Sequence, residues 1–307
     1  MPLVNTKEIL DKANREGYAV GAFNINNMET VTAVVSAASE LNSPVIIEVS
    51  ESAIKYMGIE MASAMVSRLA RDVRIPVALH LDHGKKWEII ILSIRNGFSS
   101  VMIDASDMEF EKNIEMTKKV VEIAHPAGVS VEAELGRLAG IEDDLSVAER
   151  ESFLIDPEEA MRFTQETEVD FLAPAIGTSH GAFKFKGEAK LDFQRLKSVK
   201  ENTQIPLVLH GASSVSETLL ERAEKSGLVL QGAKGVSDEV LKKAVSLGIN
   251  KVNTDTDLRI AFTTGIRMVL LKNNSVFDPR KILGPGRDFM KETVKERIKL
   301  LGSDGKA

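Results

Sequence analysis

The residues of this chain that are best suited to chemistry are three histidines with a common setting. His83, His180 and His210 each follow a short apolar run, and each is followed by glycine, which lets the backbone approach a bound group closely. A lone histidine is more often a satisfied polar residue than a ligand. Three neutral imidazoles at one edge that leave a coordination position open are typical of a catalytic zinc site. Because the chain has no cysteine, histidines and carboxylates have to supply any transition-metal ligands.

The other two histidines have a different setting. His80 lies three residues before His83 in the same apolar run, and we expect its side chain to point away from the face that His83 addresses. It would then pack in the core or support the metal ligands without contacting the metal. His125 ends a helical pattern, where the helix dipole favours a cation, and we expect it to be structural.

Carboxylates accompany the three histidines. Asp82 directly precedes His83 and is placed for proton transfer to a substrate at the metal. Asp104 and Glu134 have two interpretations that the sequence leaves open: a second metal position, or orientation of the histidine rings through hydrogen bonds. Glu132 alternates with Glu134 along its apolar run, and we expect only one of the two to face the interior.

Two further segments have the composition of phosphate-binding loops. His210-Gly-Ala-Ser213-Ser214 and Asn253-Thr-Asp-Thr256 offer hydroxyls and backbone N–H groups just before predicted helices. A lone serine or threonine there is usually a helix cap, but two such loops beside a metal site favour a phosphate site.

Eight short apolar runs supply the elements that must position these residues, and each precedes a polar stretch and a helical pattern. Continuous apolar runs are typical of parallel strands buried on both faces, and their alternation with helices indicates βαβ units. Eight such units predict a (β/α)8 TIM barrel of the α/β class, whose functional residues gather at the carboxyl ends of the strands; an open doubly wound sheet is the alternative. The predicted strands are Tyr18–Ile25, Pro44–Val49, Val77–Leu81, Ser100–Asp104, Val129–Leu135, Asp170–Pro174, Pro206–His210 and Asn250–Thr254.

Residues 1–307 are predicted to form a single barrel domain, because a barrel of this kind needs about 250 residues. Helical periodicity is clearest over Glu29–Leu41, Met61–Asp72 and Ile114–His125. Two segments exceed a minimal barrel. A long acidic connection over about 136–157 reads as an active-site loop, and residues 257–307 read as two extra helices separated by 273–286. Extra terminal helices of this kind suggest a homodimer or homotetramer.

Composition excludes some functional classes. The net charge of −6 and the lack of long runs of like charge argue against a nucleic-acid partner. No apolar stretch approaches the roughly 18 residues of a membrane span, and the charged N-terminal pattern does not suit a signal peptide. We therefore expect a cytoplasmic enzyme with no membrane partner.

At these residues the sequence resembles the class II fructose-bisphosphate aldolase family, and more closely its shorter bacterial branch. The similarity spans most of the chain in the order of the family's motifs. The matching segments are GAFNINN (21–27), LHLDHG (79–84), SVMID (100–104), VEAELGRLAGIEDD (131–144), APAIGTSHGAFK (173–184), VLHGASSV (208–215) and INKVNTDTDLRIAFT (249–263).

The resemblance implies a role for each matching residue. His83, His180 and His210 would bind zinc, which cobalt can replace, and Asp104 and Glu134 would serve neighbouring metal positions. Asp82 would exchange a proton with the aldehyde oxygen, and Glu142 in the acidic loop would exchange one with the carbon of the triose enediolate. Asn253 would stabilise that enediolate. The ketose end and its phosphate would lie against Gly181, Lys184, Gly211, Ser213, Asp255 and Thr256, and the other end of the sugar bisphosphate against Asn24, Ser50 and Arg259, the last reaching in from a second subunit. The resemblance also implies a monovalent cation near Gly181 and Gly211, and triose phosphates as the products.

Other functions remain open at this point. A tagatose-bisphosphate aldolase would use the same chemistry on an epimeric substrate, and a zinc hydrolase would use similar histidines to activate water. A purely structural zinc site would be closed by a fourth ligand. An aldolase that forms an imine needs a reactive lysine; the predicted sixth strand has none, but Lys251 in the eighth keeps that mechanism open.

Overall fold

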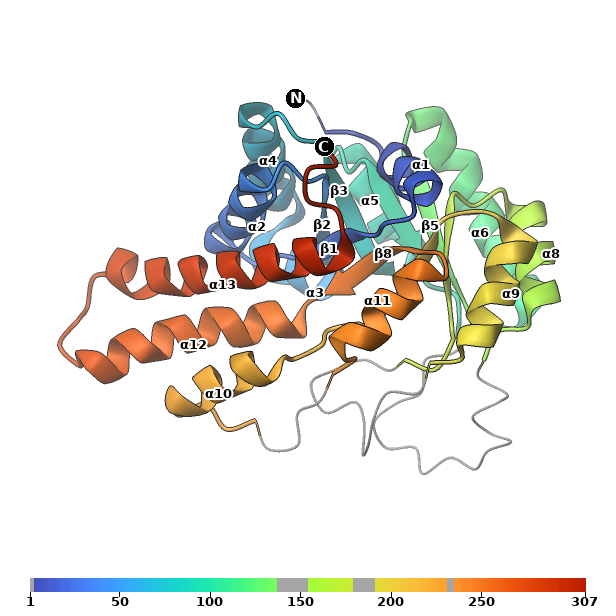
Figure 1. Cartoon of the computed structure of the whole chain (residues 1–307). Helices are drawn as coiled ribbons and strands as arrows, with labels where there is room; N and C mark the ends of the chain where they lie inside the picture. The colour runs from blue at the N-terminus through green and yellow to red at the C-terminus, as the bar shows by residue number, and fades with distance from the viewer. Residues whose placement is uncertain (1–2, 137–153, 179–190, 231–234) are drawn as a thin grey trace.

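Eight parallel strands form a closed barrel in the computed structural model, which describes residues 3–136, 154–178, 191–230 and 235–307 (Figure 1). The barrel closes because β1 pairs with β8, so the open-sheet alternative is excluded. The strands are β1 (Val20–Asn24), β2 (Val45–Ser50), β3 (Val77–Gly84), β4 (Ser100–Ile103), β5 (Ser130–Leu135), β6 (Phe171–Pro174), β7 (Leu207–Leu209) and β8 (Ile249–Thr254).

Helices surround this barrel. They include the three predicted segments, each within a few residues of its expected bounds. The helices are α1 (Thr6–Glu16), α2 (Met28–Glu40), α3 (Glu51–Met57), α4 (Ile59–Asp72), α5 (Trp87–Arg95), α6 (Phe110–Ala124), a 3-10 turn η1 (His125–Ala127), α8 (Pro157–Thr167), α9 (Phe193–Thr203), α10 (Glu217–Lys225), α11 (Asp238–Ser246), α12 (Thr256–Lys272) and α13 (Pro279–Leu301).

The strand side chains separate into an outer and an inner set. Outward-facing residues such as Phe23, Ile47 and Val131 join the main core beneath the helices. Inward-facing residues such as Ala22, Ile46 and Phe171 form a smaller apolar cluster with Ile9, Leu10 and Ala13 of α1, which therefore closes the amino end of the barrel. Apolar packing is thus placed at one end, and polar groups are left for the other.

Burial along the strands confirms this polarity. Nearly every strand residue is buried, and the three that are only partly so are Ser50, His83 and Asn253, all in the carboxyl-terminal parts of their strands. The open end of the barrel is therefore the carboxyl end, as the sequence predicts.

The two C-terminal helices extend beyond the barrel as an antiparallel pair (Figure 1). The predicted separator, 273–286, is too long, because α13 begins at Pro279 with Asp278 as its cap and continues through Pro285. Glycines in both helices allow them to pack closely against each other. A side-chain carbon at Gly265 would lie 2.6 Å from the Pro285 carbonyl, and one at Gly286 would lie 2.9 Å from the Phe262 carbonyl. The glycines thus mark a close helix crossing.

Within the described residues, no helix is long and apolar enough to cross a membrane. Most of the predicted acidic connection, residues 137–153, lies outside the described part of the chain.

Candidate active site

Polar side chains from seven of the eight strands or the residues just past them meet at the carboxyl end of the barrel. We call this set the rim: Asn24, Ser50, Asp82, His83, Asp104, Glu134, His210 and Asn253. The remaining strand, β6, leads to His180, Gly181 and Lys184, which lie outside the described residues, as does Glu142.

His83, Glu134 and His210 form a group that can hold a metal ion. Each offers one ligand atom, and these atoms all lie within 4.8 Å of one another. Two imidazole nitrogens and a carboxylate oxygen suit zinc, which takes both kinds of ligand. The structure therefore brings together two of the three predicted histidine ligands and one of the two predicted carboxylates.

A bulge in β3 explains how two consecutive residues reach the same site. Leu81 pairs with Val101 and Gly84 with Ile103, so two residues of β3 oppose one residue of β4. His83 has a φ of 50°, in the left-handed region that non-glycine residues seldom adopt. Strand alternation alone would send Asp82 and His83 to opposite faces, and the bulge turns His83 back to the rim.

Gly84 is required for this geometry. A side-chain carbon at Gly84 would lie 2.6 Å from the Met102 carbonyl oxygen of the neighbouring strand. The glycine that follows His83 therefore serves close packing against β4, a role other than the predicted approach of the backbone to a bound group.

Asp104 holds the ring of His83. The Nδ1 atom of His83 lies 2.8 Å from Asp104 Oδ2, and Ser106 donates its hydroxyl proton to the other oxygen of Asp104 at 2.8 Å. Burial raises the pKa of Asp104, but the hydrogen bond and charge of His83 outweigh it and lower the pKa below its usual range. This contact favours the orienting role among the two that the sequence leaves open for Asp104.

Both carboxylates of β5 contact His210. The Nδ1 atom of His210 lies 2.8 Å from Glu134 Oε2, and its Nε2 atom lies 2.7 Å from Glu132 Oε1. The expectation that only one of these glutamates faces the interior is therefore wrong. Residues two apart on a strand lie on the same face, so Glu132 and Glu134 point inward together.

Asp82 lies between two asparagines. Asn24 donates to one of its oxygens at 2.8 Å and Asn253 to the other at 3.4 Å. Burial raises the pKa of Asp82, but the charges of His83 and Lys251 outweigh it and lower the pKa. Asp82 is thus an anionic carboxylate beside the metal group, its Oδ1 3.8 Å from Nε2 of His83.

A layer of ionisable groups lies just beneath the rim, and the sequence reasoning missed most of it. We call Glu48, His80, Glu132 and Lys251 the buried ionic layer; all are fully buried. Each precedes a rim residue by two positions, which places it on the same strand face one layer deeper. That spacing is the sequence signal that would have found it.

His80 belongs to this layer rather than to the metal group. Its Nδ1 atom lies 2.7 Å from Ser100 Oγ, and burial lowers its pKa to about 3, so the ring is neutral. The expected supporting role agrees with these contacts. The expected orientation is wrong, because His80 points inward with Asp82 and the bulge brings His83 to the same side.

The loops after β7 and β8 are joined to each other. The Asp255 N–H donates to Ser213 Oγ at 3.4 Å. Asp257, in the first turn of α12, accepts the N–H groups of Ser214 and Val215 at 3.3 and 2.8 Å. Thr256 begins α12, so the predicted phosphate residues meet at a helix N-terminus, where anions are favoured.

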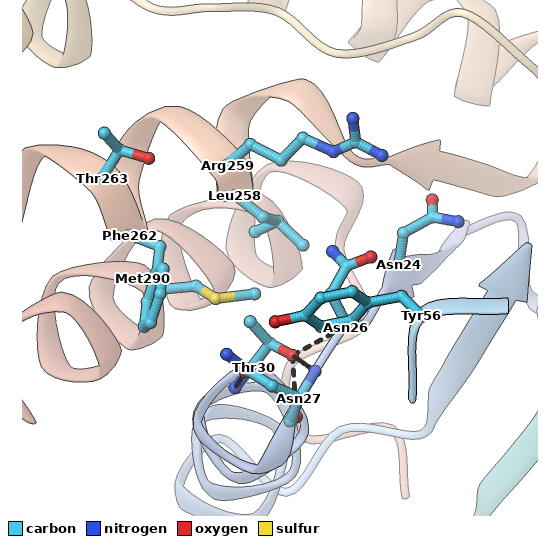
Figure 2. Close-up of a pocket in the computed structure, with 10 residues that line it drawn as sticks. All are labelled: Asn24, Asn26, Asn27, Thr30, Tyr56, Leu258, Arg259, Phe262, Thr263 and Met290. Carbon is cyan, nitrogen blue, oxygen red and sulfur yellow. Dashed lines mark hydrogen bonds between the residues drawn. The ribbon is translucent and has the colours of Figure 1, made fainter. Parts of the chain in front are cut away.

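A cavity of about 420 Å³ opens beside the rim (Figure 2). Asn24 and Arg259, both assigned by the resemblance to the second end of the substrate, line it together with Tyr56 from α3. The resemblance implies an Arg259 from a second subunit, whereas this Arg259 lies beside Asn24 of its own chain. Arg259 also pairs with Asp255, at 2.7 Å. Ser50 does not line this cavity; its hydroxyl caps α3 by accepting the Ala53 N–H at 3.3 Å.

His125 has the structural role expected for it. It follows α6 directly, and its Nε2 atom lies 2.9 Å from Oδ2 of Asp170, which is not a rim residue.

Comparison with known proteins gives a consistent result. The family model described as fructose-bisphosphate aldolase class-II matches residues 4–228 and 219–306. The chain is 57% identical to a fructose-bisphosphate aldolase of Helicobacter pylori over 99% of both chains. It is 53% identical to one of Thermus caldophilus over 99% of this chain and all of the relative. The crystal structure of the YdjI aldolase from Escherichia coli K12 superposes with a TM-score of 0.82 at 35% identity, over 99% of both chains.

Proposed function

Because the chain belongs to the class II fructose-bisphosphate aldolase family, we propose that it cleaves fructose 1,6-bisphosphate reversibly to dihydroxyacetone phosphate and glyceraldehyde 3-phosphate, a reaction of glycolysis and gluconeogenesis. The observation that carries the proposal is the group formed by His83, Glu134 and His210 directly beside the anionic Asp82.

Zinc is the cofactor that this group fits. His83 and His210 would hold it, together with the predicted ligand His180, and Glu134 would supply a neighbouring carboxylate position. When bound, zinc supplies the Lewis acidity that a retro-aldol cleavage needs for the negative charge of the enediolate. Cobalt as a replacement and a monovalent cation near Gly181 and Gly211 are part of this proposal.

The chain's own residues would carry the proton transfers. Asp82, held by Asn24 and Asn253, would take the proton from the hydroxyl that becomes the aldehyde oxygen and return it in the condensation direction. The amide N–H group of Asn253 would donate to the enediolate. Glu142 would exchange the proton at the enediolate carbon, and closure of its loop would exclude water.

Two regions would bind the phosphates. Gly211, Ser213, Asp255 and Thr256 would hold the ketose phosphate end with Gly181 and Lys184. The cavity lined by Asn24 and Arg259 would receive the other end. Ser50, which does not line that cavity, remains the third residue predicted for this end.

The setting of Lys251 argues against an imine mechanism. A lysine that attacks a carbonyl has to lose its proton, which requires a depressed pKa. Burial lowers the pKa of Lys251, but the charges of Glu132 and Glu48 more than reverse this and raise it above its usual value. Lys251 is therefore an ammonium group, which cannot attack a carbonyl, and this argues against the imine mechanism.

The test is cleavage of fructose 1,6-bisphosphate before and after treatment with EDTA, with zinc added back and tagatose 1,6-bisphosphate run in parallel. We expect activity to be lost on chelation, to return with zinc, and to be faster on fructose 1,6-bisphosphate. EDTA-resistant cleavage would contradict the metal mechanism, and a zinc-dependent preference for tagatose would reassign the substrate. Sedimentation of the same protein tests the predicted homodimer or homotetramer, and cell fractionation tests the predicted cytoplasmic location.

A further inference from the structure

Lys251 has three partners: it donates hydrogen bonds to Glu132 and Asn253 and forms an ion pair with Glu48. Its Nζ atom lies 2.6 Å from Glu48 Oε1, 2.8 Å from Glu132 Oε2 and 2.9 Å from Asn253 Oδ1. The side chain is fully buried inside the barrel. An ammonium group donates three hydrogen bonds and accepts none, so each contact fixes which atom of the partner faces it.

The contact with Glu132 determines how His210 is protonated. One oxygen of Glu132 accepts from Lys251, and the other lies 2.7 Å from Nε2 of His210. A carboxylate held by an ammonium group acts as an acceptor, so Nε2 of His210 has to carry a proton. The ring nitrogen that remains for a metal is Nδ1, which is the atom facing Glu134. A group that hydrogen-bonds to one ring nitrogen of a metal-binding histidine commonly fixes its tautomer and its orientation in this way.

The contact with Asn253 determines which end of its amide faces the reaction. Only the amide oxygen can accept from Lys251, so the amide NH₂ has to point the other way. It points to Asp82, whose Oδ1 atom lies 3.4 Å away. The group presented beside Asp82 is therefore a donor, as an enediolate oxygen requires.

We infer that Lys251 is a positioning residue that orders both halves of the active site at once: through Glu132 it selects Nδ1 of His210 as the metal-binding atom, and through Asn253 it directs an N–H group at the reacting oxygen. This inference rests on the proposed metal-dependent aldolase function. Lys251 itself stays one layer beneath the rim and does not touch the substrate.

Three variants separate the two effects of Lys251. We call the contact with His210 through Glu132 the metal arm and the contact with Asn253 the amide arm. Lys251→Met removes both arms at similar side-chain length. Glu132→Gln removes only the metal arm, because an amide cannot accept from both Lys251 and His210. Glu48→Gln is the matched control: it changes the third partner of Lys251 at unchanged side-chain shape and touches neither His210 nor Asn253.

The measurements are titration with Co²⁺ alone, followed by its visible absorption, and kcat and KM at saturating Co²⁺. We expect Glu132→Gln to weaken Co²⁺ binding about 10- to 100-fold with kcat within a factor of three. Lys251→Met should weaken Co²⁺ binding and also lower kcat about 10-fold or more at saturation, and Glu48→Gln should change neither. If Lys251→Met behaves like Glu48→Gln while the wild-type protein binds Co²⁺ and cleaves the substrate, the inference is wrong and the proposed function stands. A wild-type protein that does neither would overturn the proposed function itself.

A measurement on the wild-type protein covers the case in which Lys251→Met does not fold. In the zinc-loaded protein with ¹⁵N-labelled histidine, we expect His210 to show a proton on Nε2 and none on Nδ1. The opposite tautomer would overturn the inference without any variant.

Discussion

Replacing Arg297 with methionine tests how the C-terminal helices support the loops after β7 and β8, which we propose to bind phosphate. Arg297 lies in α13 and is buried, with its guanidinium in hydrogen-bond contact with Ser214 Oγ and 3.2 Å from both Asp257 and Asp238. Asp257 in turn accepts the N–H groups of Ser214 and Val215. Arg297 therefore supports the loop after β7 both directly and through a fully buried carboxylate.

The magnitude follows from the burial of each pair. Breaking a buried ion pair by removing one partner costs about 3–5 kcal/mol, because the other charge is left uncompensated. The pair of Nε with Asp257 Oδ2 lacks hydrogen-bond geometry, which favours the lower end. Asp238 is about half exposed and adds at most about 1 kcal/mol. We expect Arg297→Met to lower the free energy of unfolding by about 3 kcal/mol.

Substrate affinity should fall as well. Val215 is a β-branched residue with a φ of 47°, a conformation that costs roughly 1–3 kcal/mol and persists only if its surroundings hold it. Without Arg297 the loop after β7 would be free to relax away from the proposed phosphate site. A loss of about 1.4 kcal/mol of phosphate binding corresponds to a tenfold rise in KM.

Urea unfolding and steady-state kinetics measure the two effects. Arg280→Met is the matched control, because Arg280 is 90% exposed and pairs with Asp278 of its own helix start. We expect that control to stay within about 0.5 kcal/mol of the wild type. An Arg297→Met protein with unchanged KM and a stability loss no larger than that of the control would refute this account of the loop.

Three further predictions concern single positions. Asp82→Asn keeps the side-chain shape between Asn24 and Asn253 but removes the proton acceptor, so kcat should fall about 10²- to 10⁴-fold. Zinc content, measured by elemental analysis, should stay unchanged. A near-normal kcat would rule out Asp82 as the base. Gly84→Ala places a carbon 2.6 Å from the Met102 carbonyl, so it should destabilise the protein by about 1–3 kcal/mol and weaken zinc binding by displacing His83. Thermal melting measures the loss of stability, and chelator competition measures the loss of zinc affinity. Wild-type values of both would contradict the role given to Gly84. Lys200 donates to the Ile205 carbonyl and to Asn250, and burial lowers its pKa to about 8. Because its folded pKa lies below the unfolded value, the unfolded chain binds more protons from pH 8 upward, so the stability of the wild type relative to Lys200→Met should rise from about pH 8 to above pH 10. Urea unfolding at pH 7.5 and 10 tests this, and a stability difference that falls or stays constant over that range would show the sign to be wrong.

The fold was accessible from the sequence because barrel strands carry a strong local signal. Runs such as Val101–Ile103 are apolar throughout, since one face meets the helices and the other the barrel interior. The ends of the runs then located the rim, because a polar residue at the carboxyl end of a buried strand has one place to point. Asp82, His83 and His210 follow from that argument without any knowledge of the coordinates.

The remaining features depend on pairing and packing, which no local pattern reveals. The bulge that redirects His83 is a mismatch between β3 and β4, and it exists only once the two strands are aligned. The close crossing of α12 and α13 depends on Gly265 and Gly286, which meet only once the two helices are packed. The inward direction of Glu132 was open to prediction, since it follows from the two-residue period that already placed Glu134.

That two-residue period also accounts for the layered interior of the barrel. Ala78, His80 and Asp82 lie on the same face of β3, and they belong in turn to the apolar cluster over α1, the buried ionic layer and the rim. Unpaired carboxylates at the depth of Glu48 and Glu132 would be too costly to bury, so Lys251 has to be charged for the layer to exist. Once charged, Lys251 leaves its neighbours no alternative protonation or amide orientation. The charge that Lys251 needs for the buried ionic layer to fold thus also fixes the donors and acceptors that His210 and Asn253 present at the rim.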